Sequence, residues 1–280
     1  MTIMEVCRAM ADKLASAGIE DSQSDSKILF EYITGVTANE LYLNPDKELD
    51  NESVNKCMAA VNKRIDHIPV QHITGRQEFM GLEFAVNEHV LIPRFDTEVL
   101  VEEAMRIELS HLRILDMCTG SGCILLSLLH YSHDCEGVGV DISPEALEVA
   151  RMNADRLGID AEFVLSDLFD GLKDNKLTYD LIISNPPYIP TDVIPTLMEE
   201  VKEHEPILAL DGSADGLDYY RRIISESPAF ITKGGNLMFE IGYDQGEAVS
   251  GLMRDAGYSD VEVVKDLSGL DRVVRGRWEN

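Results

Sequence analysis

The chain has 280 residues, of which 24 are basic and 51 acidic, so its formal net charge is −27. This length is enough for one large domain and a smaller one. The negative charge argues against a phosphate-rich partner such as nucleic acid, because general repulsion would weaken every contact with a phosphate.

The first 70 residues are expected to form a helical bundle. Apolar residues recur there at helical spacing, and Gly18 and Gly35 stand where glycine ends a helix. One helix is expected over Ser24–Thr34, and Thr37 can cap a short helix after it. A fourth helix must end before Pro69. Such a bundle serves either stability or substrate recruitment, and its separate place at one end favours recruitment for residues 1–70.

Residues 71–92 change to turn signals and short extended pieces, with glycines around Phe79 and Met80. We expect a β-hairpin linker there, followed by a larger domain over residues 93–280. Asp96 or Thr97 is available to cap a helix that runs to roughly Leu109.

After His111, short apolar runs alternate with helical segments, as in a doubly wound α/β domain. The expected strands are Arg113–Met117, Gly137–Asp141, Glu162–Leu165, Tyr179–Ser184, Asn236–Ile241, Asp260–Val264 and Asp271–Arg275. We therefore expect a seven-stranded, mostly parallel sheet that ends in an antiparallel hairpin. This fold is typical of methyltransferases that depend on S-adenosylmethionine (SAM).

His130, His133 and Cys135 lie close together in the sequence, but no second group of ligands completes a metal site. We expect a solvated loop, no bound metal, and free thiols at the five cysteines. No apolar run reaches about 18 residues. We expect a cytoplasmic monomer without a membrane segment.

A glycine turn follows the first of these strands and opens a helix, which is a common way to bring backbone amides close to a ligand. An acidic residue ends the next strand and can accept hydrogen bonds from ribose hydroxyls. The third glycine of a phosphate-binding fingerprint is missing, and a carboxylate precedes the turn, so SAM is favoured over a dinucleotide. The expected cofactor-binding residues are Asp116, Cys118, Thr119, Gly120, Ser121, Gly122, Asp141, Asp167, Leu168 and Asn185.

The tetrapeptide Asn185-Pro186-Pro187-Tyr188 follows the fourth of these strands and should reach the same edge of the sheet. The prolines fix an extended loop, Asn185 adds a side-chain acceptor, and Tyr188 adds a flat ring. The Asn185 side chain and the Pro186 carbonyl can accept both hydrogens of an NH₂ group, which would orient its nitrogen for methylation. We therefore expect Asn185, Pro186 and Tyr188 to be catalytic and all four residues to bind the substrate.

With these residues in view, the chain resembles the bacterial glutamine methyltransferases that modify peptide chain release factors. The resemblance covers nearly the whole chain, including the residue stretches 91–98, 205–212, 215–218, 240–246 and 265–272. It implies methylation of the glutamine amide in the Gly-Gly-Gln motif of class-1 release factors, with SAM as donor. Cys118 stands where this family usually has glycine, Leu168 replaces an aromatic residue of some relatives, and Phe95 stands where proline is common.

Two other readings remain open. A methyltransferase for an exocyclic amine of adenine or guanine can use the same tetrapeptide, but it needs a basic approach surface. A non-catalytic SAM-binding scaffold would have no use for an intact Asn185 and Tyr188.

Overall fold

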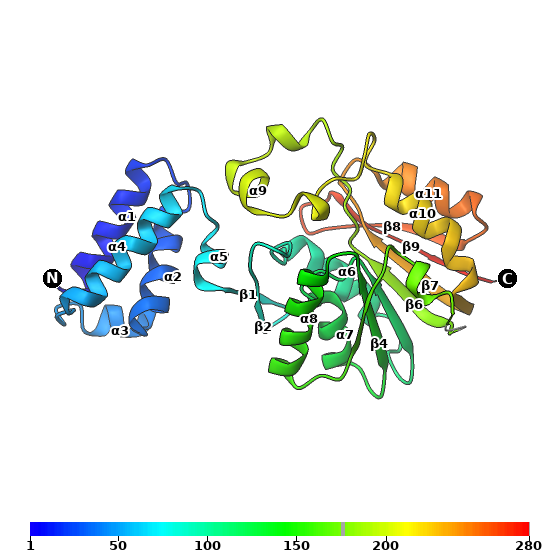
Figure 1. Ribbon diagram of the computed structural model, residues 1–280, viewed down its shortest axis with the longest axis horizontal. Coiled ribbons are helices and arrows are strands. Elements are labelled where there is room, and N and C mark those ends of the chain that lie inside the picture. Colours follow the sequence, from blue (N-terminus) through cyan, green and yellow to red (C-terminus); the bar gives the residue numbers. More distant parts are fainter. Residues whose placement is uncertain (175–176, 280) are drawn as a thin grey trace. The chain divides into compact units, whose positions relative to one another are not determined.

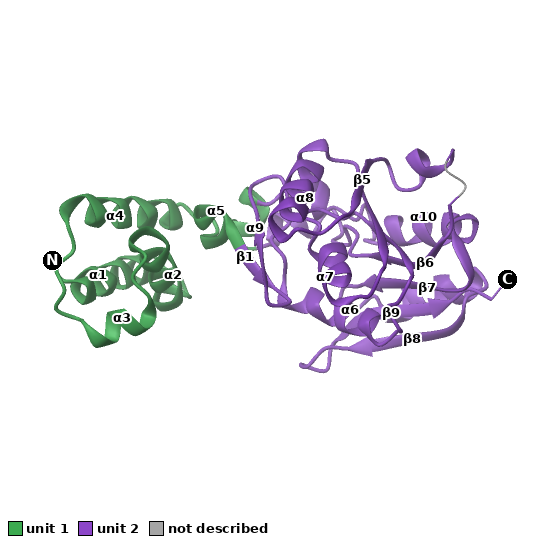
Figure 2. Cartoon of the chain, turned by 90° about the horizontal axis from the view of Figure 1, so that it is seen from below, with its two compact units in different colours: residues 1–76, 198–204 green, residues 77–197, 205–280 purple. Residues whose placement is uncertain are grey.

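The computed structural model describes residues 1–174 and 177–279, and the chain divides into two compact units (Figure 2). Unit 1 comprises Met1–Arg76 and Met198–His204, and unit 2 comprises Gln77–Leu197 and Glu205–Asn280. The short segment 198–204 thus leaves unit 2 along the chain and folds with unit 1.

Unit 1 is a helical bundle around a core of its own. Its helices are α1 (Ile3–Ser16), α2 (Ser22–Thr34), α3 (Ala38–Leu43), α4 (Asn51–Ile65), α5 (Val70–Thr74) and α9 (Glu199–His204). The core joins buried side chains of the first four, such as Met10, Phe30, Leu41 and Val61. Gly35 ends α2 in the left-handed conformation, and the Thr37 hydroxyl accepts a hydrogen bond from the Glu40 amide, so both capping predictions are confirmed.

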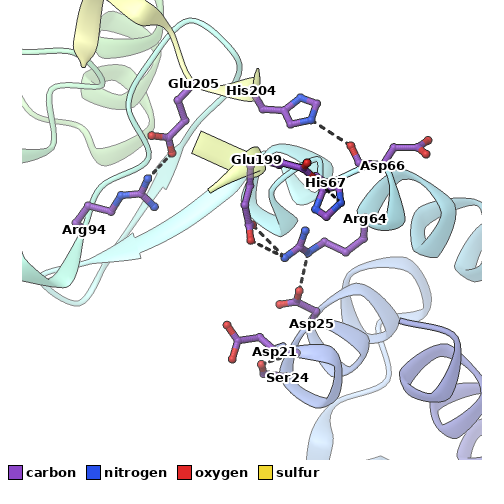
Figure 3. A network of polar contacts seen from close by, with 11 residues as sticks. Asp21, Ser24, Asp25, Arg64, Asp66, His67, Arg94, Glu199, His204 and Glu205 are labelled. Carbon is purple, nitrogen blue, oxygen red and sulfur yellow. Dashed lines mark hydrogen bonds and ion pairs between the residues drawn. The ribbon is translucent and has the colours of Figure 1, made fainter. Parts of the chain in front are cut away.

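Helix α9 is tied to the rest of unit 1 by polar contacts (Figure 3). The buried Arg64 donates from Nε to Asp25 Oδ2 at 2.6 Å, and its Nη2 lies 3.0 Å from Glu200 Oε2. His67 Nε2 lies 2.8 Å from Glu199 Oε2, and His204 Nε2 lies 3.1 Å from the Asp66 carbonyl oxygen. Two carboxylates thus share one buried guanidinium, a geometry that suits its fixed fork of donors.

The linker differs from the expected hairpin over residues 71–92, because helix α5 occupies its first part. A helix of five residues is too short to show the helical period of apolar residues, so the sequence pattern does not predict it. The hairpin itself is short, with β1 (Arg76–Phe79) and β2 (Leu82–Ala85). Met80 and Gly81 join them, both with positive φ, as a two-residue type I′ turn requires.

Unit 2 is built on a seven-stranded sheet in the order β5-β4-β3-β6-β7-β9-β8. The strands are β3 (Arg113–Met117), β4 (Glu136–Asp141), β5 (Glu162–Leu165), β6 (Tyr179–Ser184), β7 (Ile231–Glu240), β8 (Ser259–Lys265) and β9 (Asp271–Arg277). The first five in this order pair in parallel, and β9 is antiparallel to both β7 and β8. The predicted α/β methyltransferase fold is confirmed.

Alternate strand residues pack on opposite faces of this sheet, as the two-residue period of a strand requires. On one face, Leu115, Ile182 and Leu237 join a core completed by α10 (Asp218–Glu226) and α11 (Gly246–Asp255). On the other, Ile114, Leu181 and Met238 pack with α6 (Phe95–Met105), α7 (Cys123–Tyr131) and α8 (Pro144–Leu157) (Figure 1). Short 3₁₀ helices cover Asp170–Leu172, Ile194–Thr196, Ile207–Ala209 and Ser227–Ala229.

The start of α6 corrects one prediction. Its N-cap is Arg94, and neither Asp96 nor Thr97 caps it. Asp96 instead lies 3.1 Å from the Arg272 guanidinium, and Thr97 accepts a hydrogen bond from Asn185. The helix also ends at Met105, before Leu109. Among the described helices, none has the length and apolar character that a membrane span requires.

Candidate active site

A cavity of about 270 Å³ opens at the carboxyl ends of β3, β4, β5 and β6 in unit 2. Ligands of parallel α/β sheets bind at this edge. The cavity is lined by the glycine turn, by residues after β4 and β5, by Asn185 and Pro187, and by apolar groups. The apolar lining includes Leu91, Pro93, Ile142, Leu168, Pro206 and Leu208.

The glycine turn runs from the end of β3 into the first turn of α7. Gly120 and Gly122 have φ of +54° and +78°, a region that favours glycine. A side chain at Gly122 would also crowd Leu126 and Ala150, at 3.2 and 3.3 Å. Cys118 has a φ of +59° as well, so this cysteine has a backbone conformation that favours glycine.

Asp141, the last residue of β4, is positioned by backbone amides. Its Oδ2 accepts a hydrogen bond from the Gly120 amide at 2.9 Å, and its Oδ1 accepts one from the Ser143 amide at 3.0 Å. Burial raises the pKa of this carboxyl, and the backbone hydrogen bonds oppose that rise. The remaining acceptor capacity of Asp141 faces the cavity that it lines.

Two expected cofactor residues lie outside the cavity lining, namely Asp116 and Gly122. Asp116 is fully buried, and its Oδ2 accepts a hydrogen bond from the Thr119 hydroxyl at 2.6 Å. Burial raises the pKa of Asp116 to about 7. Asp116 therefore supports the glycine turn through its hydrogen bond with Thr119, and it does not line the cavity.

The other expected cofactor residues, Cys118, Thr119, Gly120, Ser121, Asp167, Leu168 and Asn185, all line the cavity. Asp167 is also paired with Arg222 at 2.8 Å, so a guanidinium occupies part of its acceptor capacity. Leu168 has a φ of +49°, which turns the chain just after β5.

The tetrapeptide 185–188 follows β6 directly. The Ser184 hydroxyl donates to the Met117 carbonyl at 2.7 Å, which holds the ends of β6 and β3 together. Asn185 Nδ2 donates to Thr97 Oγ1 at 3.3 Å, and both side chains line the cavity. Pro186 and Pro187 are buried, and of these two only Pro187 lines the cavity.

Tyr188, which was expected to be catalytic and to bind the substrate, does not line the cavity. It is held by residues that the sequence did not assign to the site. Its hydroxyl donates to Glu240 Oε1 at 3.3 Å, and its carbonyl accepts from Gln245 Nε2 at 3.0 Å. A side chain at Gly212 or Gly216 would collide with the Tyr188 backbone. Gly212, Gly216, Glu240 and Gln245 lie in the stretches 205–212, 215–218 and 240–246, which contributed to the family resemblance. The resemblance did not assign a role to these stretches.

The glycine turn, the acidic residue after β4, the tetrapeptide after β6 and the sheet order together define a SAM-dependent methyltransferase. The fit to SAM rests on the described cavity. Its left-handed glycine turn lets the backbone approach a ligand, Asp141 offers carboxylate oxygens, and the apolar lining suits a flat base.

Comparison with known proteins identifies the family. Residues 5–75 match the PrmC N-terminal domain family, and residues 94–204 match the methyltransferase small domain family. A release factor glutamine methyltransferase from Geobacter sulfurreducens is 42% identical, over 99% of this chain and 96% of the relative. One from Caulobacter vibrioides is also 42% identical over the same shares. The chain belongs to the release factor glutamine methyltransferase family.

A solved structure supports the fold alone. A methyltransferase from Pyrococcus furiosus matches with a TM-score of 0.53 and 14% identity, over 71% of this chain and 90% of that one.

Proposed function

We propose that this chain transfers a methyl group from SAM to the side-chain amide nitrogen of the glutamine in the Gly-Gly-Gln motif of class-1 peptide chain release factors. The observation that carries the proposal is the placement of Asn185 beside the cavity of unit 2, at the end of β6. Family membership supplies the substrate class.

The cofactor would be held by the glycine turn, by Asp141 through its carboxylate, and by the lining around Leu168. SAM, when bound, supplies the methyl group in electrophilic form. The protein's own part is to hold the acceptor nitrogen in place, since an amide lone pair is delocalised and a poor nucleophile.

Asn185 Oδ1 and the Pro186 carbonyl are the two acceptors that the tetrapeptide can offer to a substrate NH₂ group. Accepting both hydrogens would raise electron density on nitrogen and orient it for attack. The buried Pro186 and Pro187 have no amide hydrogens, so neither competes for these acceptors.

The test is transfer of a labelled methyl group from SAM to a purified class-1 release factor. We expect labelling of the factor, and none when its Gly-Gly-Gln glutamine is replaced. Equal labelling of both factors would overturn the substrate assignment. Labelling of nucleic acid in place of the factor would support the alternative, an amine methyltransferase for adenine or guanine.

A variant tests the role of the tetrapeptide. Asn185→Ala should lower kcat by about 100-fold or more, as losing an acceptor or donor of the reacting group does in other enzymes. Affinity for SAM should stay within a few-fold. Asn55→Ala is the matched control, because Asn55 is exposed on α4 in unit 1. Full activity of Asn185→Ala would refute the role of the Asn185 amide.

A further inference from the structure

The proposed function requires that the Asn185 side chain be held in one of its two orientations, and the inference rests on that function. An asparagine amide can turn either its oxygen or its nitrogen toward the cavity, and only the oxygen accepts a hydrogen bond from a substrate N–H. We propose that Thr97 and Glu240 are positioning residues: Thr97 fixes the Asn185 amide with its oxygen toward the substrate, and Glu240 orders Thr97 while it holds the Tyr188 hydroxyl.

The first link is the contact of Asn185 with Thr97. Asn185 Nδ2 donates to Thr97 Oγ1 at 3.3 Å, which leaves Oδ1 available to the cavity that both residues line. Thr97 is 2% exposed and lies in the first turn of α6. A hydroxyl has a single proton. Thr97 must therefore send that proton to another acceptor if it is to accept from Asn185.

Glu240 is the acceptor that the structure offers. It ends β7 and is 2% exposed, and its Oε1 accepts the hydrogen bond of the Tyr188 hydroxyl. Its Oε2 is buried and has no hydrogen-bond partner among the described residues. The Thr97 hydroxyl is a neighbouring donor that favours the charged form of Glu240. A buried acceptor without a partner is costly, so a donor beside it is expected to bond to it.

The ionised carboxylate of Glu240 determines the direction of every hydrogen bond in this network. It can only accept, so Tyr188 and Thr97 must both donate to it. Thr97 then has only lone pairs for Asn185, which must turn its NH₂ group to Thr97 and its oxygen to the cavity. A neutral carboxyl has a proton of its own and would no longer enforce this order.

The groups around Glu240 come from several elements. Burial raises the pKa of Glu240 to about 7, the Arg272 cation opposes the rise, and the Asp96 carboxylate adds to it. Arg272 is itself shared with Asp96 and Asp266, each at 3.1 Å. The Tyr220 phenol and the Cys123 thiol also face Glu240, and burial keeps both neutral by raising their pKa values. The ordering carboxylate is thus lost as pH falls through about 7, and activity should fall with it.

The first experiment measures steady-state methyl transfer to a release factor by the full-length chain. Thr97→Val keeps the shape of the side chain and removes the hydroxyl. We expect kcat to fall at least 10-fold, while KM for SAM stays within about two-fold. Thr97→Ser, which restores a hydroxyl, should recover most of the activity. Thr178→Val is the control, because Thr178 is exposed ahead of β6.

The pH profile tests Glu240. The wild-type chain should lose activity below about pH 7, and Glu240→Gln should have low activity without this acidic limb. A Thr97→Val variant with wild-type kcat, or a Glu240→Gln variant that keeps the acidic limb, would overturn the proposal. If Asn185→Ala is inactive while Thr97→Val is fully active, the proposed function stands and only the positioning role fails.

A second readout needs no substrate. The side-chain NH₂ resonances of Asn185 can be assigned by NMR through their loss in Asn185→Ala. We expect them to shift between pH 6 and 8 in the wild-type chain and to lose this shift in Thr97→Val and in Glu240→Gln. If the Asn185 resonances of the wild-type chain do not change with pH, the positioning role is overturned. This test remains valid even if release factors prove not to be the substrate.

Discussion

At the scale of single residues, Cys118 is the residue of the cofactor loop whose type fits its backbone conformation least well. Its φ of +59° lies in the left-handed region, which costs an L-residue roughly 1–3 kcal/mol. Burial also raises the pKa of its thiol well above the usual range. A glycine at this position would avoid the backbone strain, so the turn tolerates a side chain at some cost in stability.

Substitutions at Cys118 should separate strain from packing. We expect Cys118→Gly to change the free energy of unfolding by less than about 1 kcal/mol, because relief of strain offsets the greater freedom of glycine in the unfolded chain. Cys118→Val should cost about 2 kcal/mol or more, since a β-branched residue fits positive φ poorly. Urea unfolding measures both. Equal effects of Gly and Val at position 118 would contradict the role of strain.

The buried carboxyl of Asp116 leads to a second prediction at this scale, on the pH dependence of stability. Burial raises its pKa from 3.8 to about 7. The folded state therefore holds a proton that the unfolded state releases, and the stability from Asp116 falls as pH rises from about 4 to about 7. The loss should be about 1 kcal/mol per pH unit in this window. Asp116→Asn should remove this slope while keeping an oxygen for the Thr119 hydroxyl.

The measurement is urea unfolding of the wild type and Asp116→Asn at pH 5 and pH 8. Glu240 and Asp141 also have raised pKa values, but both are present in the two chains, so the difference between the chains reports Asp116 together with its coupling to Asp141. A difference between the two proteins that does not change with pH would show that Asp116 keeps its proton, or its charge, throughout.

At the scale of elements, the strands of unit 2 followed from local pattern. Apolar runs bounded by turn residues predicted all seven, and β3 and β6 begin and end as expected. The start of α6 did not follow, because Asp96 and Thr97 look like caps but contact Arg272 and Asn185 instead. Tertiary partners had taken the groups that a cap would use.

The same limit applied to the site. The placement of Asp141, Gly120 and Asn185 at the cavity was predictable, because Asp141 ends a strand, Asn185 follows one and Gly120 lies in a glycine turn. Thr97, Glu240 and Gln245 were not, because their roles depend on contacts with Asn185 and Tyr188, which lie far from them in the sequence. The resemblance included the stretch that holds Glu240 and Gln245, but a single sequence does not show which residues they contact.

Helix α9 leads to a prediction for unit 1. Arg64 is 5% exposed and joins Asp25 to Glu200, and burial raises the pKa of Asp25 against the pull of the guanidinium. Arg64→Ala would leave Asp25 buried without its cation and should destabilise unit 1 by about 3–5 kcal/mol. Arg64→Lys should recover only part, because lysine lacks the fork of donors.

Hydrogen exchange of the full chain measures this locally. We expect the amides of α2 and α4 to lose protection in Arg64→Ala, and those of the central strands β3 and β6 to keep it. Arg8→Ala, an exposed arginine on α1, is the control. Unchanged protection in α2 and α4 would show that the Arg64 contacts contribute little.

At the scale of the whole molecule, the net charge of −27 and the division into two units bear on how a protein substrate is bound. A strongly acidic chain attracts basic partners and repels acidic ones, with a range set by the ionic strength. Every residue that lines the cavity belongs to unit 2. Unit 1 has a core of its own, so its role must lie in something other than completing the cofactor site.

We predict that deleting residues 1–75 leaves SAM binding within a few-fold of the full chain, because the cavity lining stays complete although α9 loses its partners in unit 1. If unit 1 recruits the substrate, kcat/KM for a folded release factor should fall at least 10-fold, mainly through KM. A short Gly-Gly-Gln peptide, which has no surface for unit 1 to bind, should be methylated equally by both forms. Calorimetric titration and steady-state rates measure these quantities. Equal losses for factor and peptide would mean that unit 1 serves the stability of the enzyme, since a recruiting surface acts only on the substrate that carries its partner.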